Sequence, residues 1–214
     1  KGKSIYDNAL LHVGKECVLN MDLKDFFPSI TQKAVFNIFY QKGYTKNVSY
    51  YLAKLLTKDG VLPQGSPASP KISNIVALHL DKRLSELAKC YKATYSRYAD
   101  DLTFSGASNI KNMIPIITQI IHEEAFFVNE KKTRYSYYFQ KQEVTGLIVN
   151  KKVSAPKEYL RELNKEIYYC KKFGVSSHLT KTENHKSFFK EYMYGKAYFV
   201  NMIDKELGQK ILCE

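Results

Sequence analysis

Residues 93–106 constrain the fold of this 214-residue chain more than any other segment. Two β-rich arms flank a polar centre, Asp100 and Asp101, and this pattern predicts a β-hairpin with the two acids at its tip. A tight turn can bring neighbouring carboxylates to one point, where their like charges are costly unless a cation neutralises them. An isolated Asp-Asp pair is more often ordinary turn chemistry, so other segments must decide between the two interpretations.

A third carboxylate favours a metal site. Residues 17–22 predict a short, mostly apolar strand that ends in Asp22. If this strand pairs with the hairpin, Asp22 adds an oxygen ligand beside Asp100 and Asp101. An all-oxygen site suits Mg²⁺, which retains waters and accepts substrate phosphates. Two such ions can activate an attacking hydroxyl and stabilise a leaving pyrophosphate.

Helices are predicted around these strands. Thr31 is the expected N-cap of a helix that stops at Gly43, and the breaker-rich residues 60–70 exclude regular structure locally. Periodicity predicts further helices at 47–57, 72–88, 110–124, 156–174, 188–194 and 196–202, and strands at 135–139 and 143–149. The element order predicts an α+β fold with helices packed on a mainly antiparallel sheet.

The charge balance predicts a polyanionic partner. Lys and Arg number 33 against 21 Asp and Glu, which leaves +12 and a pI near 9.3, an excess that attracts nucleic acid or an anionic membrane. The membrane is disfavoured, because no apolar run reaches about 20 residues and no leader opens the chain. The four cysteines lie far apart, without a Cys-x-x-Cys pair. A cytoplasmic protein is therefore expected.

Three ordered motifs resemble those of the reverse transcriptase family. Tyr98-Ala-Asp-Asp101 has the form of the family's catalytic box, residues 20–29 look like its first palm motif, and residues 62–70 look like its second. Two shorter signatures, Asn8-Ala-Leu-Leu-His12 and Val144-Thr-Gly146, are similar to those of the bacterial retron type. The resemblance runs from Asn8 to the helical tail.

This resemblance implies a right-hand polymerase. It divides the chain into partial fingers and palm at residues 1–153 and a small helical thumb at residues 154–214. Because the chain opens without Met, we expect an N-terminal portion to be missing. The thumb interleaves Lys and aromatic residues, which suits phosphate contacts and stacking on unpaired bases.

The resemblance also assigns the metal ligands. Asp22, Asp100 and Asp101, with the backbone carbonyl of Leu23, are expected to hold two Mg²⁺, for which Mn²⁺ can substitute. Asp25 is expected near the incoming triphosphate. The alternative is that Asp25 caps the helix that follows.

Four further residues are implied to handle the nucleotide. Phe27 matches the aromatic position that blocks a ribose 2′-hydroxyl, with core packing as the alternative. Gln64 and Gly65 lie where the family contacts nucleotide and template, or merely at a helix entry. Lys132 is the expected lysine near the triphosphate and a proton donor to pyrophosphate, with Lys131 as its competitor.

Three features stay open at the level of sequence. His12 either contacts a structured RNA or is a structural histidine that makes a hydrogen bond within the fold. Tyr98 either packs against a primer sugar or fills the sheet. Residues 144–146 either grip primer or RNA, or form an apolar strand with a glycine kink.

The implied function is that of a retron RNA-directed DNA polymerase. It would add dNTPs to a primer hydroxyl on a cognate noncoding RNA, which supplies the template and a branching-guanosine 2′-hydroxyl, and so produce branched RNA–DNA (msDNA). The resemblance further implies antiphage defence with an effector protein. The alternatives are another bacterial reverse transcriptase, of the group II intron, diversity-generating or abortive-infection type, and a non-catalytic RNA-binding scaffold. The three intact acids argue against the scaffold.

Overall fold

The computed structural model describes residues 4–181 and 188–213. The chain forms two compact units. The sheet unit is Lys15–Gln142, and the terminal unit combines Lys1–Gly14 with Glu143–Glu214.

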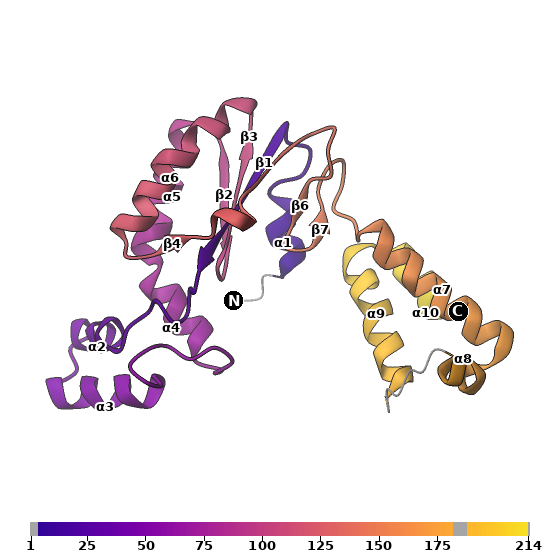
Figure 1. Cartoon of the computed structure of the whole chain (residues 1–214), viewed down its shortest axis with the longest axis horizontal. Helices are drawn as coiled ribbons and strands as arrows, with labels where there is room; N and C mark the ends of the chain where they lie inside the picture. The colour runs from indigo at the N-terminus through magenta and orange to yellow at the C-terminus, as the bar shows by residue number, and fades with distance from the viewer. Residues whose placement is uncertain (1–3, 182–187, 214) are drawn as a thin grey trace. The chain divides into compact units, whose positions relative to one another are not determined.

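The sheet unit is built around one central strand (Figure 1). Strand β1 (Cys17–Lys24) pairs with β3 (Asp101–Gly106) on one edge and with β5 (Arg134–Tyr137) and β4 (Phe127–Val128) on the other. β2 (Thr94–Tyr98) pairs with β3. Every pairing among the described strands is antiparallel. The predicted hairpin and its pairing with the first strand are therefore confirmed.

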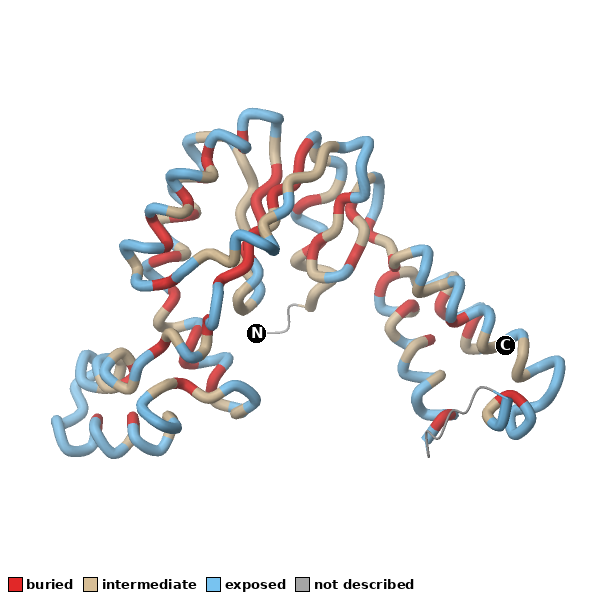
Figure 2. Tube along the Cα trace, in the orientation of Figure 1, coloured by how far each residue is buried: buried red, intermediate tan, exposed pale blue. Residues whose placement is uncertain are grey.

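Helices α5 (Leu78–Cys90) and α6 (Ile114–Glu123) pack against strands of this sheet, as do the 3-10 turns η1 (Ser108–Met113) and η2 (Glu130–Lys132). Helix α2 (Gln32–Gln41) packs instead against α3 (Lys46–Leu56) and α4 (Ser69–Val76). Thr31 caps α2, as predicted, by accepting a hydrogen bond from the Ala34 amide. Leu19, Leu84 and Phe104 lie in the core, and the buried segments of the tube in Figure 2 follow β1 and β3.

Two predicted helices of the sheet unit are divided. The single helix expected at 72–88 is wrong, because Ala77 has ψ near 1° and separates α4 from α5. The α-helix expected at 110–124 begins only at Ile114, after η1. Pro115 accounts for the second difference, because its ring cannot follow an α-helical turn and is tolerated only in the first turn.

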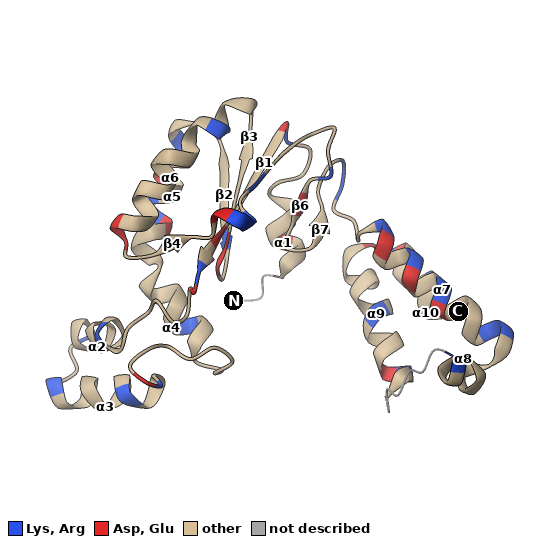
Figure 3. Cartoon of the chain, viewed as in Figure 1, with Lys and Arg blue, Asp and Glu red and all other residues tan. Residues whose placement is uncertain are grey.

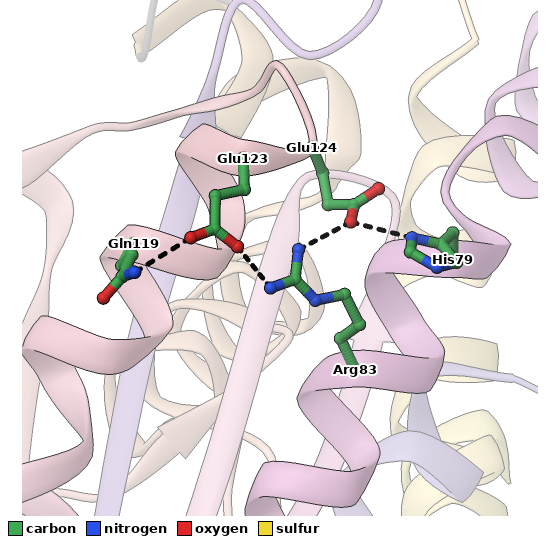
Figure 4. Close-up of polar contacts among 5 residues, drawn as sticks. All are labelled: His79, Arg83, Gln119, Glu123 and Glu124. Atoms are coloured by element: carbon green, nitrogen blue, oxygen red, sulfur yellow. Dashed lines mark hydrogen bonds and ion pairs between the residues drawn. The ribbon is translucent and has the colours of Figure 1, made fainter.

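A polar network joins α5 to α6 (Figure 4). The guanidinium of Arg83 donates Nη1 to Glu124 at 2.8 Å and Nη2 to Glu123. His79 contacts the same Glu124 oxygen at 2.7 Å, and Gln119 donates to Glu123 at 2.8 Å. The network fixes one helix against the other at the sheet surface.

The terminal unit joins the first helix to a small hairpin and a helical bundle. It contains α1 (Ile5–Leu10), β6 (Glu143–Val144), β7 (Leu147–Ile148), α7 (Lys157–Phe173), α8 (Val175–Lys181), α9 (Phe189–Ile203) and α10 (Lys205–Cys213). Leu163, Ala197, Val200 and Ile211 form the bundle core. No described helix, in either unit, is long and apolar enough to cross a membrane.

Three predictions for the terminal unit are corrected. The strand expected at 143–149 is a tight hairpin, because Thr145 and Gly146 both have positive φ. The two helices expected at 188–194 and 196–202 are one helix, α9, which tolerates Gly195 at a cost of about 1 kcal/mol relative to Ala. Pro156 is the N-cap of α7 and not its first residue.

Candidate active site

The sheet brings the three acids together. Asp22 of β1 lies directly opposite Asp101 of β3 in the strand register, and such cross-strand pairs have Cβ atoms about 4.5–5.5 Å apart. Ala99 and Asp100 form the two-residue turn between β2 and β3, so Asp100 comes directly before Asp101. Residues separated by about 80 positions in the chain therefore meet at one end of the sheet.

The backbone holds this turn against β1. The Leu23 amide donates to the Asp100 carbonyl at 3.0 Å. Ala99, the first turn residue, has a φ of 53°, a left-handed conformation that costs an L-residue about 1–2 kcal/mol. The turn is thus strained, and it is tied to the strand that carries Asp22.

The carboxylate of Asp22 has two side-chain partners. It is nearly buried, with 7% of the residue exposed. Lys132 Nζ lies 2.8 Å from Oδ1, and Asn129 Nδ2 donates to Oδ2 at 3.2 Å. The hydrogen bond and charge of Asp22 raise the pKa of Lys132, with smaller contributions from Asp100 and Asp101. Lys132 is therefore a protonated ammonium beside the acids.

Asp101 carries the cost of the clustered negative charge. Desolvation, then the charge of Asp100, then that of Asp22 raise the pKa of Asp101, and Lys132 opposes them. Neighbouring carboxylates that resist joint ionisation attract a cation.

The donor set fits Mg²⁺ by chemistry. All the acidic side chains at this end of the sheet offer carboxylate oxygens, and Mg²⁺ in proteins usually takes one or two carboxylates together with waters and substrate phosphates. Within the described ranges, no group of three or more His, Cys, Asp or Glu side chains is arranged to hold a metal ion. Asp22 pairs instead with Lys132.

Asp25 and Phe27 follow directly after β1. Asp25 is exposed with a φ of 49°, and its carbonyl accepts from the amide and hydroxyl of Ser29. The alternative that Asp25 caps the next helix is wrong, because Thr31 caps α2. Phe26 is buried, whereas Phe27 is half-buried and meets it edge to face with ring centroids 5.4 Å apart.

Gln64 and Gly65 lie in the loop before α4. Both are exposed, and Gly65 has a φ of 89°. The Pro63 carbonyl, just before them, accepts from the Ser69 hydroxyl at 2.6 Å, which closes the loop onto the helix entry. No described contact joins Gln64 or Gly65 to the acids.

The two retron-like signatures meet in the terminal unit. Thr145 Oγ1 donates to the Ile5 carbonyl of α1 at 3.4 Å, and α1 packs against β7. His12 is fully buried, which favours its structural interpretation. Tyr98 is 49% exposed at the end of β2, so its side chain is not buried in the core of the sheet unit.

Three polar residues near the acids have no role assigned from the sequence. Asn129 donates to Asp22, and Arg97 and Asp81 form an ion pair beside the turn. Asn129 belongs to the segment that supplies Lys132, three positions away, which is the only signal the chain offered for it. No such signal marks Asp81, because the residue pattern around it is that of an ordinary solvent-exposed helix face.

Comparisons with known proteins agree with this geometry. A family model described as "Reverse transcriptase (RNA-dependent DNA polymerase)" matches residues 1–182. The chain belongs to the reverse transcriptase family. Within it the chain is of the bacterial retron type: it is 37% identical to the retron Ec86 reverse transcriptase of Escherichia coli over 185 residues, covering 84% of this chain and 58% of the relative.

Two further relatives show the same type. The retron Mx162 reverse transcriptase of Myxococcus xanthus is 33% identical, with 100% of this chain and 50% of the relative covered. The retron Ec83 reverse transcriptase of Escherichia coli is 31% identical, with 99% of this chain and 72% of the relative covered. This reverse transcriptase chain spans about half the length of several relatives it matches.

Solved structures show a shared fold. Telomerase from Candida albicans, in complex with a TWJ fragment of telomeric RNA, superposes with a TM-score of 0.52 at 12% identity, covering 98% of this chain and 48% of that one. Apo telomerase from Candida tropicalis superposes with a TM-score of 0.51 at 14% sequence identity, covering 71% of this chain and 38% of that one. At these identities the likeness supports the α+β polymerase fold of this reverse transcriptase and nothing finer.

Proposed function

We propose that this retron-type reverse transcriptase is an RNA-directed DNA polymerase that adds dNTPs to a primer hydroxyl. The observation that carries the proposal is the pairing of Asp22 with Asp101 across β1 and β3, with Asp100 in the adjoining turn. Metal-assisted nucleotide transfer needs ligands held at one point, and a sheet holds these carboxylates rigidly.

In this proposal the three acids bind metal ions and Lys132 donates a proton. Asp22, Asp100 and Asp101, with the carbonyl of Leu23, would hold Mg²⁺ or Mn²⁺, and such ions would activate the primer hydroxyl and stabilise the leaving pyrophosphate. Lys132 carries its proton at Nζ, 2.8 Å from Asp22, and can give it to the pyrophosphate as a general acid. Within the described residues Lys131 has no comparable contact with an acid.

We assign the nucleotide contacts to the residues that follow β1 and precede α4, of which Asp25, Gln64 and Gly65 are exposed and Phe27 is half-buried. Asp25 orients the triphosphate end, and Phe27 blocks a ribose 2′-hydroxyl, so that deoxynucleotides are preferred. Gln64 and Gly65 contact nucleotide and template, where the absence of a Cβ at Gly65 lets backbone approach a ligand closely.

The wider layout is that of a right hand. Residues 1–153 are partial fingers and palm, and residues 154–214 are a thumb. The thumb helices carry exposed aromatic residues beside lysines, and Figure 3 shows basic residues along α7. Lys172 Nζ lies 5.5 Å from the ring centroid of Tyr168, a pairing suited to a template-primer duplex or structured RNA.

The retron type extends the proposal to partners. The names of the relatives above support the retron type. The proposal for that type includes a cognate noncoding RNA that supplies template and branching guanosine, a branched RNA–DNA product, and antiphage defence in the cytoplasm with an effector protein. The excess of 33 basic over 21 acidic side chains fits binding to that RNA.

Incorporation of labelled dTTP on poly(rA)/oligo(dT) tests the activity. We expect incorporation by the wild-type protein and none by the Asp100→Ala, Asp101→Ala double variant. A variant with Glu86→Ala and Glu158→Ala is the matched control, because it removes two exposed acids of α5 and α7 and should keep full incorporation. An inactive wild type that still binds its cognate RNA would favour the scaffold, and sequencing a product that is not complementary to template would favour the abortive-infection type.

A further inference from the structure

Arg97 lies under the turn that carries the acids. Its side chain is 6% exposed and donates Nε to Asp81 Oδ1 and Nη2 to Asp81 Oδ2, both at 2.7 Å. Asp81 belongs to α5, and Arg97 belongs to β2. A bidentate guanidinium–carboxylate pair has fixed geometry, because both groups are planar. The pair therefore links a helix rigidly to the strand that enters the turn.

The third arm of the same guanidinium reaches the turn itself. Arg97 Nη1 donates to the Ala99 carbonyl at 2.9 Å. Ala99 is the residue with a φ of 53°, in a conformation that glycine adopts freely and alanine does not. The next two residues are Asp100 and Asp101. The strained residue is thus the one that Arg97 grips.

The surroundings leave the guanidinium one orientation. The Tyr95 hydroxyl donates to Asp81 Oδ1 at 2.8 Å, and the Phe26 ring centroid lies 5.7 Å from Arg97 Cζ. Burial, and then the charge of Asp81, raise the pKa of Tyr95, so its hydroxyl remains a donor. On the far side, the Leu23 amide holds the Asp100 carbonyl at 3.0 Å.

We propose that Arg97, anchored by Asp81, is a positioning residue that keeps Ala99 left-handed and so sets Asp100 and Asp101 opposite Asp22. Only the consequence for catalysis rests on the proposed polymerase function; the control of the turn by Arg97 stands apart from it. A lysine cannot replace Arg97, because one ammonium cannot serve both Asp81 oxygens and the Ala99 carbonyl in this geometry.

Hydrogen exchange of the Leu23 amide in the full chain tests the positioning without activity. Arg97→Lys should speed its exchange about tenfold, because the turn that accepts its hydrogen bond opens more often. Arg83→Lys is the matched control: the Arg83 guanidinium also forms ion pairs between elements, here with Glu123 and Glu124 (Figure 4), but no described contact joins it to the turn. It should leave Leu23 exchange unchanged.

The Ala99→Gly substitution supplies the decisive rescue test. Because glycine adopts a positive φ without a clamp, Ala99→Gly should restore slow Leu23 exchange in the Arg97→Lys protein. Ala99→Gly should change the Leu23 exchange rate by at least about threefold more in the Arg97→Lys protein than in the wild-type protein. A merely structural Arg97 would give no such rescue. If Arg97→Lys fails to fold, Asp81→Asn replaces it, because that variant keeps Arg97 and removes its anchor.

Primer extension adds the functional readout. Arg97→Lys should lower kcat about tenfold or more with little change in KM for dNTP, and Ala99→Gly should recover part of that loss. Unchanged Leu23 exchange in both Arg97→Lys and Asp81→Asn, or equal effects of Ala99→Gly in the two backgrounds, would overturn the positioning role. An inactive wild type with altered exchange in the variants would instead reject the polymerase function alone.

Discussion

The acidic centre of the sheet unit and the helical bundle of the terminal unit differ in how their charged side chains are arranged. In the sheet unit, Asp22 is nearly buried, opposes Asp101 and pairs with Lys132. In the bundle, Lys172 and Lys196 lie over exposed or half-buried aromatic rings, with Lys196 Nζ 4.8 Å from the Tyr192 centroid. One region concentrates charge on a rigid sheet, and the other spreads it along helices.

This difference predicts how each region responds to substitution. Groups fixed at a single point cannot be exchanged for one another, so each is individually essential. Groups spread along a surface contribute small and roughly additive amounts to binding a polyanion. Variants of the two regions should therefore differ by orders of magnitude.

Asp22→Asn should have the largest effect. The amide keeps the size of the side chain but removes the charge that opposes Asp101, so primer extension should fall at least about 10³-fold while the fold persists. Steady-state extension and circular dichroism measure the two properties. Retention of a tenth of the activity would contradict a fixed acidic centre.

Lys132→Gln should have the next largest effect. It removes the ammonium beside Asp22 and its proton, and we expect kcat to fall about 10- to 100-fold. Lys131→Gln carries the same charge change on the neighbouring residue and should leave kcat within about twofold of wild type. Equal losses in both variants would mean that net charge, and not the contact with Asp22, is responsible.

Lys172→Gln in the bundle should act on binding alone. The loss of one phosphate contact should weaken RNA affinity a few-fold and reduce the slope of log K against log salt by about 1. Filter binding across a salt series measures both quantities. A loss as large as that of Asp22→Asn would erase the contrast between the two regions.

Asp101→Asn should raise stability slightly while it abolishes extension. Because the folded-state pKa of Asp101 is raised, the folded state binds its proton more tightly than the unfolded state. Protonation therefore stabilises the fold at low pH, and that stabilisation is lost as pH rises through the raised pKa. At pH 7 with EDTA, the variant should melt about 1–3 °C higher than wild type.

The pH series supplies the control for this smallest effect. Below the ordinary Asp pKa, near 4, Asp101 is protonated in both states, and the two melting temperatures should converge. A variant that melts lower than wild type at pH 7 would show that Asp101 is not under charge strain.

Local signals predicted several element boundaries. Thr31 caps α2 by its hydroxyl, and Gly174 ends α7 with a φ of 78°, as residue chemistry alone indicates. The break at Ala77 and the continuity through Gly195 were missed. Both depend on packing, since neither residue type dictates a helix end by itself.

The sequence alone determined which acids, in which order, the chain carries, and it predicted that an apolar strand ending in Asp22 could pair with the hairpin of Asp100 and Asp101. Only the tertiary structure decided that Asp22 opposes Asp101, that Lys132 and not Lys131 meets it, and that Arg97 joins Asp81 to the turn. The physical reason is that strand register and contacts between distant residues follow from burial of the whole core, which no local pattern encodes.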